Sequence, residues 1–117
     1  MSESILRDQS KEFAKNIIFM CKDIQQKHKD YVLSNQLLRS GTSIGANIHE
    51  AQYAQGKKDF ISKLEIALKE CNETEYWLDL LESAGYVDED SYKRFRNECS
   101  RLRRMLISSV TTVKSKM

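Results

Sequence analysis

The pattern of apolar and polar positions along the chain predicts four long helices. In the first, the apolar residues that follow the period of a helix with one buried face are Leu6, Phe13, Ile17, Met20 and Ile24. We expect this helix to run from Ser2 or Ser4, either of which can cap its first turn, to about Lys27. The chain contains no proline and only four glycines, which favours long uninterrupted helices.

A second helix is expected from about Tyr31, just after Asp30, to Ala54. Gly56 is then the residue that ends the helix in a left-handed conformation. Five residues share one side of this helix because they follow one another in steps of four and three: Leu37, Gly41, Ile44, Ile48 and Ala51.

Two glycines make that face of the second helix unusually small. Gly41 and Gly45 lie one turn apart, and each costs a helix about 1 kcal/mol relative to alanine. We therefore expect a neighbouring helix to approach closely here, and the alternative is a bend or partial break at Gly45. Asn47 and Glu50 flank the same narrow face, where they either make structural hydrogen bonds near a helix junction or belong to a functional site.

The third helix has the most regular pattern, a seam in alternating steps of four and three. The seam consists of Phe60, Leu64, Ala67, Cys71, Thr74, Leu78 and Leu81. Ile66, Trp77 and Leu80 lie near one another but away from this seam, because successive residues turn by about 100° around a helix. This second apolar patch is either a subunit interface or a surface covered by another helix of the same chain.

A fourth helix is expected to begin after Asp88, its natural N-cap, and to run to about Lys114. Its buried stripe is predicted to contain Tyr92, Phe95, Cys99, Leu102, Leu106 and Val113. Short connections make consecutive helices antiparallel, so the expected fold is an all-α, up-down-up-down four-helix bundle in a single domain over residues 1–117. A bundle this long is thin, and oligomerisation would bury further surface.

The composition fits a cytoplasmic globular protein. Charged residues make up 31% of the chain and hydrophobic residues 40%, and no apolar run approaches the roughly 18 residues of a membrane span. The charged N-terminus has no signal-peptide core. Cys21, Cys71 and Cys99 fall at helical core spacing, so we expect them to be reduced and buried.

Basic residues are concentrated in the fourth helix. Residues 93–117 carry eight basic side chains and Glu98 alone as an acid, a net charge of +7, whereas residues 1–92 carry −5. One interpretation is that these charges meet acids of the third helix at the edges of the helix–helix contacts. The other is that Lys93, Arg94, Arg101 and Arg104 present a basic face to RNA or DNA phosphates. No aromatic residue is interleaved with these arginines for base stacking.

No catalytic or cofactor motif stands out. Neither His28 nor His49 has a glutamate three residues before it, so the di-iron pattern of helical bundles is absent. There is no P-loop, dinucleotide fingerprint, Cys-x-x-Cys pair or nucleophile–base spacing. We therefore expect no metal, no cofactor and no enzymatic activity.

One segment carries a family resemblance. Residues 36–51, QLLRSGTSIGANIHEA, resemble the Q-[IL]-x-R-x-x-x-S-I-x-A-N-I-x-E-G signature of the 23S rRNA intervening-sequence proteins, also called four helix bundle proteins. Residues 60–81 are similar to the helix that follows in that family. Gly45 stands where the family often has proline, and Ala51 where it usually has glycine.

This resemblance implies an antiparallel four-helix bundle that assembles as a homopentamer. Members are often encoded inside insertions of bacterial 23S rRNA genes, and a relative binds nucleic acid as the accessory protein of a retroelement reverse transcriptase. The family offers no catalytic residues to carry over. Two hypotheses follow: an RNA- or DNA-binding accessory protein that uses the fourth helix, or an oligomeric scaffold for a protein partner such as a reverse transcriptase, without nucleic-acid binding. Neither involves a membrane.

Overall fold

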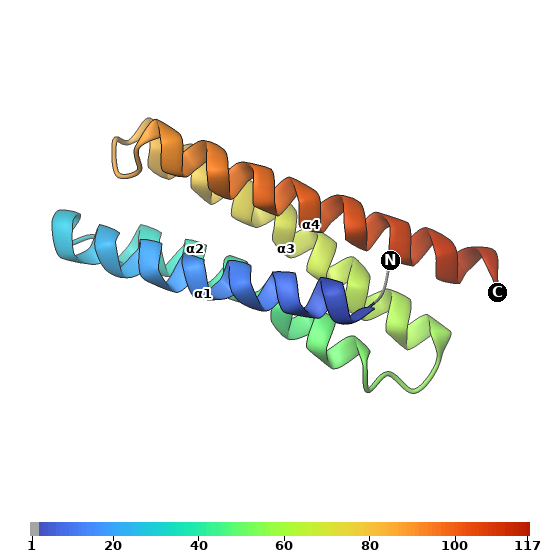
Figure 1. The fold of residues 1–117 in the computed structure, drawn as a ribbon. Helices are drawn as coiled ribbons and strands as arrows, with labels where there is room; N and C mark the ends of the chain where they lie inside the picture. The colour runs from blue at the N-terminus through green and yellow to red at the C-terminus, as the bar shows by residue number, and fades with distance from the viewer. Residues whose placement is uncertain (1–2) are drawn as a thin grey trace.

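Four helices follow one another along the chain: α1 (Glu3–His28), α2 (Tyr31–Ala51), α3 (Lys57–Ser83) and α4 (Glu89–Ser115). The computed structural model describes the backbone of residues 3–117 and the side chains from residue 5 onward. Consecutive helices run in opposite directions, and α1 and α4 also pack against each other (Figure 1). The rod measures 48 × 22 × 19 Å. The predicted all-α four-helix bundle is confirmed, and residues 3–117 contain no strand.

Aspartates cap two of the helices. The Asp30 carboxylate accepts a hydrogen bond from the Leu33 amide at 3.0 Å and begins α2. Asp88 accepts one from the Ser91 amide at 2.9 Å and begins α4. Each bond satisfies an amide that the first helical turn would leave without a partner, so both expected starts are confirmed. The serine cap expected at position 2 or 4 lies outside the side chains that the structure describes.

The predicted end of the second helix is wrong. α2 ends at Ala51, because the amides of residues 52–54 bond to carbonyls only three residues back and tighten the last turn. Gly56 does not adopt a left-handed conformation but has an extended φ of 164° and precedes α3. The left-handed glycine is Gly85, with φ 80°, which ends α3 instead.

Gly85 belongs to a Schellman motif at the end of α3. Its amide bonds to the Glu82 carbonyl at 3.0 Å, and the Tyr86 amide bonds to the Leu81 carbonyl at 2.9 Å. Tyr86 then joins the two turns at this end of the bundle. Its hydroxyl donates to Asp30 Oδ2 at 3.1 Å, and its ring stacks on His28 with centroids 4.3 Å apart.

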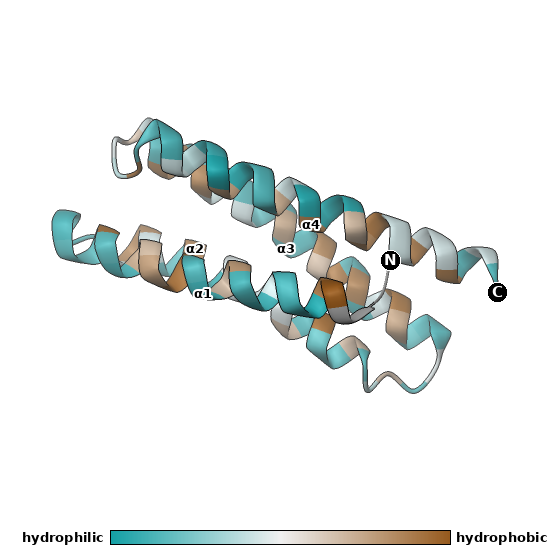
Figure 2. Ribbon diagram, in the orientation of Figure 1, coloured by the Kyte–Doolittle hydropathy of each residue, from teal (hydrophilic) through white to brown (hydrophobic). Residues whose placement is uncertain are grey.

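Apolar residues from all four helices form one core, and the hydrophilic residues cover the outside (Figure 2). All five residues of the small face of α2 are buried. A Cβ atom at Gly41 would lie 2.9 Å from Ile17 Cγ2, so the expected close approach of a neighbouring helix is confirmed there. α2 continues as a regular helix through Gly45, so the alternative of a break is wrong.

The core also contains polar groups that the apolar pattern does not reveal. Ser40 of α2 and Thr74 of α3 are fully buried, and their hydroxyl oxygens lie 3.0 Å apart. Cys21, Cys71 and Cys99 are free and buried, as predicted. Burial raises the pKa of Cys21 to about 12, and contact with Cys71 together with burial raises the pKa of Cys99.

Candidate nucleic-acid interface

α4 is an amphipathic helix whose basic residues fall into two groups. Its buried stripe contains Phe95, Cys99, Leu102, Met105, Leu106 and Val110. Tyr92 and Val113, which were predicted to be buried, are half-buried at the two ends. The basic side chains on one side of the stripe face α3, and those on the other side face solvent and α1.

The first group of cations pairs with acids of α3. Glu75, whose side chain is only 13% exposed, pairs with Arg96 at 2.8 Å and also with Arg103. Arg96 Nε lies 3.3 Å from Asp79, and Lys114 lies 3.3 Å from Glu65. For these residues the prediction that α4 and α3 match charges at the edges of their contact is confirmed.

The four candidate nucleic-acid ligands form the second group, and all are exposed: Lys93, Arg94, Arg101 and Arg104. Lys93 pairs with Glu89 at 3.0 Å within the helix, although both side chains remain mostly exposed. Arg94 and Arg101 are seven residues apart, which corresponds to about 10 Å along the helix axis. Arg104 follows one turn later on the same exposed side.

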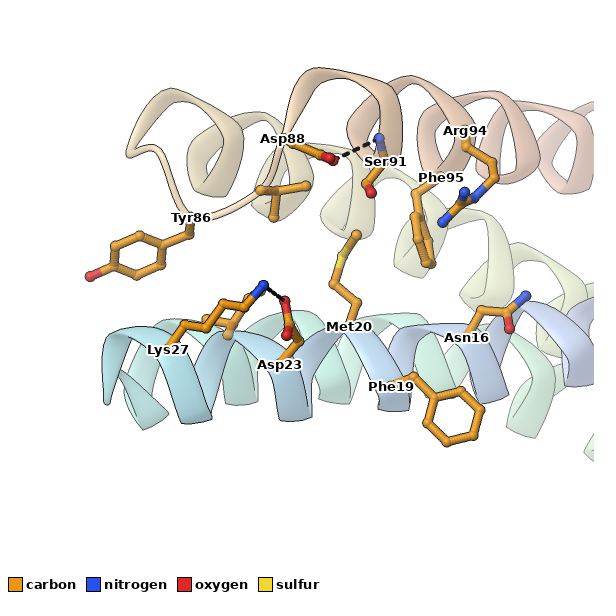
Figure 3. Close-up of a pocket in the computed structure, with 12 residues that line it drawn as sticks. Asn16, Phe19, Met20, Asp23, Lys27, Tyr86, Asp88, Ser91, Arg94 and Phe95 are labelled. Atoms are coloured by element: carbon orange, nitrogen blue, oxygen red, sulfur yellow. Dashed lines mark hydrogen bonds and ion pairs between the residues drawn. The ribbon is translucent and has the colours of Figure 1, made fainter.

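Arg94 overhangs a groove of about 410 Å³ between α1 and α4 (Figure 3). Its guanidinium lies 5.5 Å from the centre of the Phe95 ring. Met20 of α1 points toward Phe95 across the groove, while Phe19 points away from it (Figure 3). Asp88 also lines this groove, and the positive charge of Arg94 contributes to its lowered pKa, behind the hydrogen bonds from Ser91.

Arg101 lines a second, smaller groove of about 210 Å³ farther along the same α1–α4 contact. Glu98 and Glu12 line it too. Burial raises the pKa of Glu98, although the nearby Arg94 opposes the shift. Arg101 is therefore flanked by carboxylates from both helices, Glu12 of α1 and Glu98 of α4, which reduce the positive potential on this side of α4.

The second apolar patch of α3 is partly open. Ile66 is 41% exposed, whereas Trp77 and Leu80 are half-buried. Trp77 packs against the edge of the core, and its ring makes an edge contact with Tyr76, with centroids 5.0 Å apart. The patch is thus only partly covered by its own chain.

Asn47 and Glu50 have different roles in α2. Asn47 Nδ2 donates to the Ser43 carbonyl at 2.9 Å, one turn back, which is a structural hydrogen bond of the expected kind. The Glu50 side chain is exposed. Among the residues described, no group of histidine, cysteine and acidic side chains could hold a metal ion. No helix in residues 3–117 is long and apolar enough to cross a bilayer.

Two features of this region were not predicted from the sequence. One is Phe19, which is 59% exposed one position outside the helical stripe of α1 and lies on the same groove as Arg94. The other is the carboxylate pair near Arg101, because Glu12 and Glu98 come together only when α1 and α4 pack. No local pattern in the sequence signals either contact.

Comparison with known proteins identifies related chains. A family model for the 23S rRNA-intervening sequence protein matches residues 2–108. The chain is also similar to a protein of unknown function from the S23 ribosomal protein family of Bacteroides thetaiotaomicron, known from its crystal structure. The two are 47% identical over 95% of this chain and 99% of the other, with a TM-score of 0.93. No functionally curated protein matches the chain.

Proposed function

We propose that this chain, which belongs to the 23S rRNA-intervening sequence protein family, is a non-catalytic oligomeric protein that binds RNA or DNA through α4. The observation that carries this proposal is the division of the α4 cations. Arg96 and Arg103 are used in pairing with α3, whereas Arg94, Arg101 and Arg104 remain exposed along the helix. Exposed arginines in a row are suited to phosphate oxygens, which they bind in pairs of hydrogen bonds.

The carboxylates beside this face limit the affinity that we expect. Glu98 and Glu12 share a groove with Arg101, and Asp88 shares one with Arg94. Binding should therefore be moderate, independent of base sequence and strongly weakened by salt. A non-catalytic role is supported by the raised pKa values of Cys21 and Cys99, which oppose formation of a nucleophilic thiolate.

The oligomer is proposed to form through the α3 patch of Ile66, Trp77 and Leu80. An apolar side chain that is 41% exposed, on the same side of α3 as a partly covered tryptophan about three turns away, is typical of an interface that a second chain completes. The family resemblance implies five copies. An assembled ring would repeat the arginine face in each copy, so that several weak phosphate contacts act on one nucleic acid.

The test is a titration of fluorescent single- and double-stranded RNA and DNA with the protein at several salt concentrations. We expect binding at low salt that weakens steeply as salt rises, and loss of most of it in Arg101→Glu plus Arg104→Glu. A matched charge reversal elsewhere, Lys29→Glu plus Lys58→Glu, should bind nearly as the wild type does. Absence of binding at low salt, or equal loss in both double variants, would count against the proposal.

The alternative is an oligomeric scaffold that binds a protein partner without nucleic acid. The carboxylates that flank the arginines favour it, because they reduce the attraction for phosphate. The two functions are separated by purification from cell extract with and without nuclease. A protein partner that stays bound after nuclease treatment and in the Arg101→Glu plus Arg104→Glu variant would support the scaffold.

A further inference from the structure

A groove lies on the outside of the contact between α1 and α2. Its volume is about 630 Å³. α1 and α2 lie close together nearby, where Gly41 meets Ile17, and four of the residues that line the groove are small. We refer to these four lining residues as the floor of the groove: Ser10, Ala14, Gly45 and Ala46.

The rim of this groove is basic. Arg7 and Lys11 of α1 and His49 of α2 line it, with Asp8 as its one acid. Arg7 is held in place by a hydrogen bond from its guanidinium to Gln52 Oε1 at 2.6 Å. Lys11 and His49 are exposed. The groove therefore combines small residues in its floor with a positively charged edge.

The outer face of α3 has the opposite character. Ile66 and Trp77 stand beside two glutamates, Glu70 and Glu73, which are three residues apart and so lie on one side of the helix. Burial and the neighbouring Glu73 raise the pKa of Glu70, against opposing effects of Ser43 and Lys69. Two carboxylates thus lie close together between Ile66 and Trp77, an arrangement that an added cation would stabilise. We call this strip of α3, formed by Ile66, Glu70, Glu73 and Trp77, the ridge.

We propose that this ridge of one copy docks into the α1–α2 groove of a second copy. The bulky ridge matches the small-residue floor, and Glu70 and Glu73 match Arg7, Lys11 and His49 on the rim. The inference rests on the oligomer proposed above and identifies the surface that receives α3.

The geometry makes this contact head-to-tail. Groove and ridge are different surfaces, because the groove is formed by α1 and α2 whereas the ridge belongs to α3. When two copies dock, one still has an unoccupied groove and the other an unoccupied ridge. Further copies can therefore add in the same way until the last ridge meets the first groove and a ring closes. A symmetric contact of α3 with α3 would instead bring the two glutamate pairs together, which is unfavourable.

Charge reversal tests the pairing. Lys11→Glu and Glu73→Lys should each weaken assembly by about tenfold or more, measured by sedimentation velocity at micromolar concentration. The combination of both changes in one chain should restore it, because the charges are exchanged and not removed. An equimolar mixture of the two single variants should also associate in alternating order, although a closed ring of five copies would keep one mismatched contact. Lys58→Glu, a reversal outside both surfaces, should assemble like the wild type.

Trp77 provides a second measurement, because it is the chain's only tryptophan. Its emission should shift to shorter wavelength as wild-type protein becomes more concentrated, and this shift should be absent in Lys11→Glu. Circular dichroism of each variant is the check that the helices remain folded.

The outcomes separate this inference from the proposed function. Wild-type assembly that Lys11→Glu leaves unchanged would overturn the pairing while the oligomer stands. Stronger assembly in Glu73→Lys would overturn it in favour of a symmetric α3 contact. A wild-type monomer at all micromolar concentrations would overturn both the pairing and the oligomer, and the nucleic-acid titration would still test α4 separately.

Discussion

Gly41 of α2 packs so closely on Ile17 of α1 that a Cβ atom at position 41 would lie 2.9 Å from Ile17 Cγ2 and 3.0 Å from Cγ1. Ile17 is branched at Cβ and has few alternative side-chain conformations in a helix. It cannot move away without disturbing the core around it. The glycine therefore sets the distance between α1 and α2.

We expect Gly41→Ala to destabilise the protein by about 1 kcal/mol. Alanine gains about 1 kcal/mol of helix propensity, but overpacking of a rigid core typically costs about 1–3 kcal/mol. Gly45→Ala is the matched control, because its Cβ would lie 3.4 Å from the Ser10 carbonyl oxygen, an ordinary contact. That variant should be neutral or stabilised. Urea unfolding of both proteins measures the difference, and a stabilised Gly41→Ala would contradict the close-packing argument.

Glu75→Ala should destabilise the protein by roughly 2 kcal/mol, because hydrogen bonds to charged groups contribute about 1.5–3 kcal/mol. The substitution leaves Arg96 and Arg103 without their shared carboxylate, which is 13% exposed. Glu65→Ala removes the partner of Lys114, where both side chains are about half exposed. This control should cost about 0–1 kcal/mol. Similar losses of unfolding free energy in both variants would show that the burial of Glu75 does not strengthen its ion pairs.

The buried hydroxyls of Ser40 and Thr74 should be energetically coupled. Each also has a carbonyl of its own helix within reach, Leu37 at 3.3 Å for Ser40 and Glu70 at 2.8 Å for Thr74. Ser40→Ala and Thr74→Val should each cost about 1 kcal/mol, since the remaining hydroxyl keeps one partner. The double variant should be destabilised by less than the sum of the two single variants, with a difference of about 0.5 kcal/mol or more. Strictly additive unfolding free energies would exclude a direct bond between the two side chains.

Glu98→Gln should raise the melting temperature at pH 7. Burial raises the pKa of Glu98 above its ordinary 4.5, so the ionised carboxylate is less favourable in the folded state than in the unfolded one. This penalty is fully present above the raised pKa and disappears as the pH falls through it to below 4.5, where both states are protonated. The difference from wild type should therefore shrink with acidification. A difference that does not shrink with acidification would contradict this prediction.

Much of the architecture could be predicted because apolar spacing and caps are local features. The five-residue face of α2 and the caps Asp30 and Asp88 are where the sequence places them. The end of α2 was missed because tight three-residue hydrogen bonds close the helix without using Gly56. Buried Ser40 was missed because a serine that bonds within its own helix can face the core, which its polarity does not suggest.

The candidate sites were less predictable, since they depend on which helix faces which. The sequence marks eight basic residues in and after α4 but does not tell Arg96, which pairs with α3, from Arg94, which is exposed. It also gives no sign of the α1–α2 groove. That groove exists because small residues of two separate helices meet on one side.

Tyr86, which bonds to Asp30 and stacks on His28, links the α1–α2 turn to the α3–α4 turn at one end of the bundle. Both turns at that end are held through a single side chain, whereas the hydrogen bonds at the far end, from Arg7 to Gln52 and from Lys57 to the Lys116 carbonyl, join α1 to α2 and α3 to α4. We therefore expect local opening between α1 and α4 to be smallest at the end that Tyr86 holds and to grow toward the opposite end. Amide protons near the first turns of α1 should exchange with solvent sooner than those beside Asp30, and the grooves beside Arg101 and Arg94 should widen in that order.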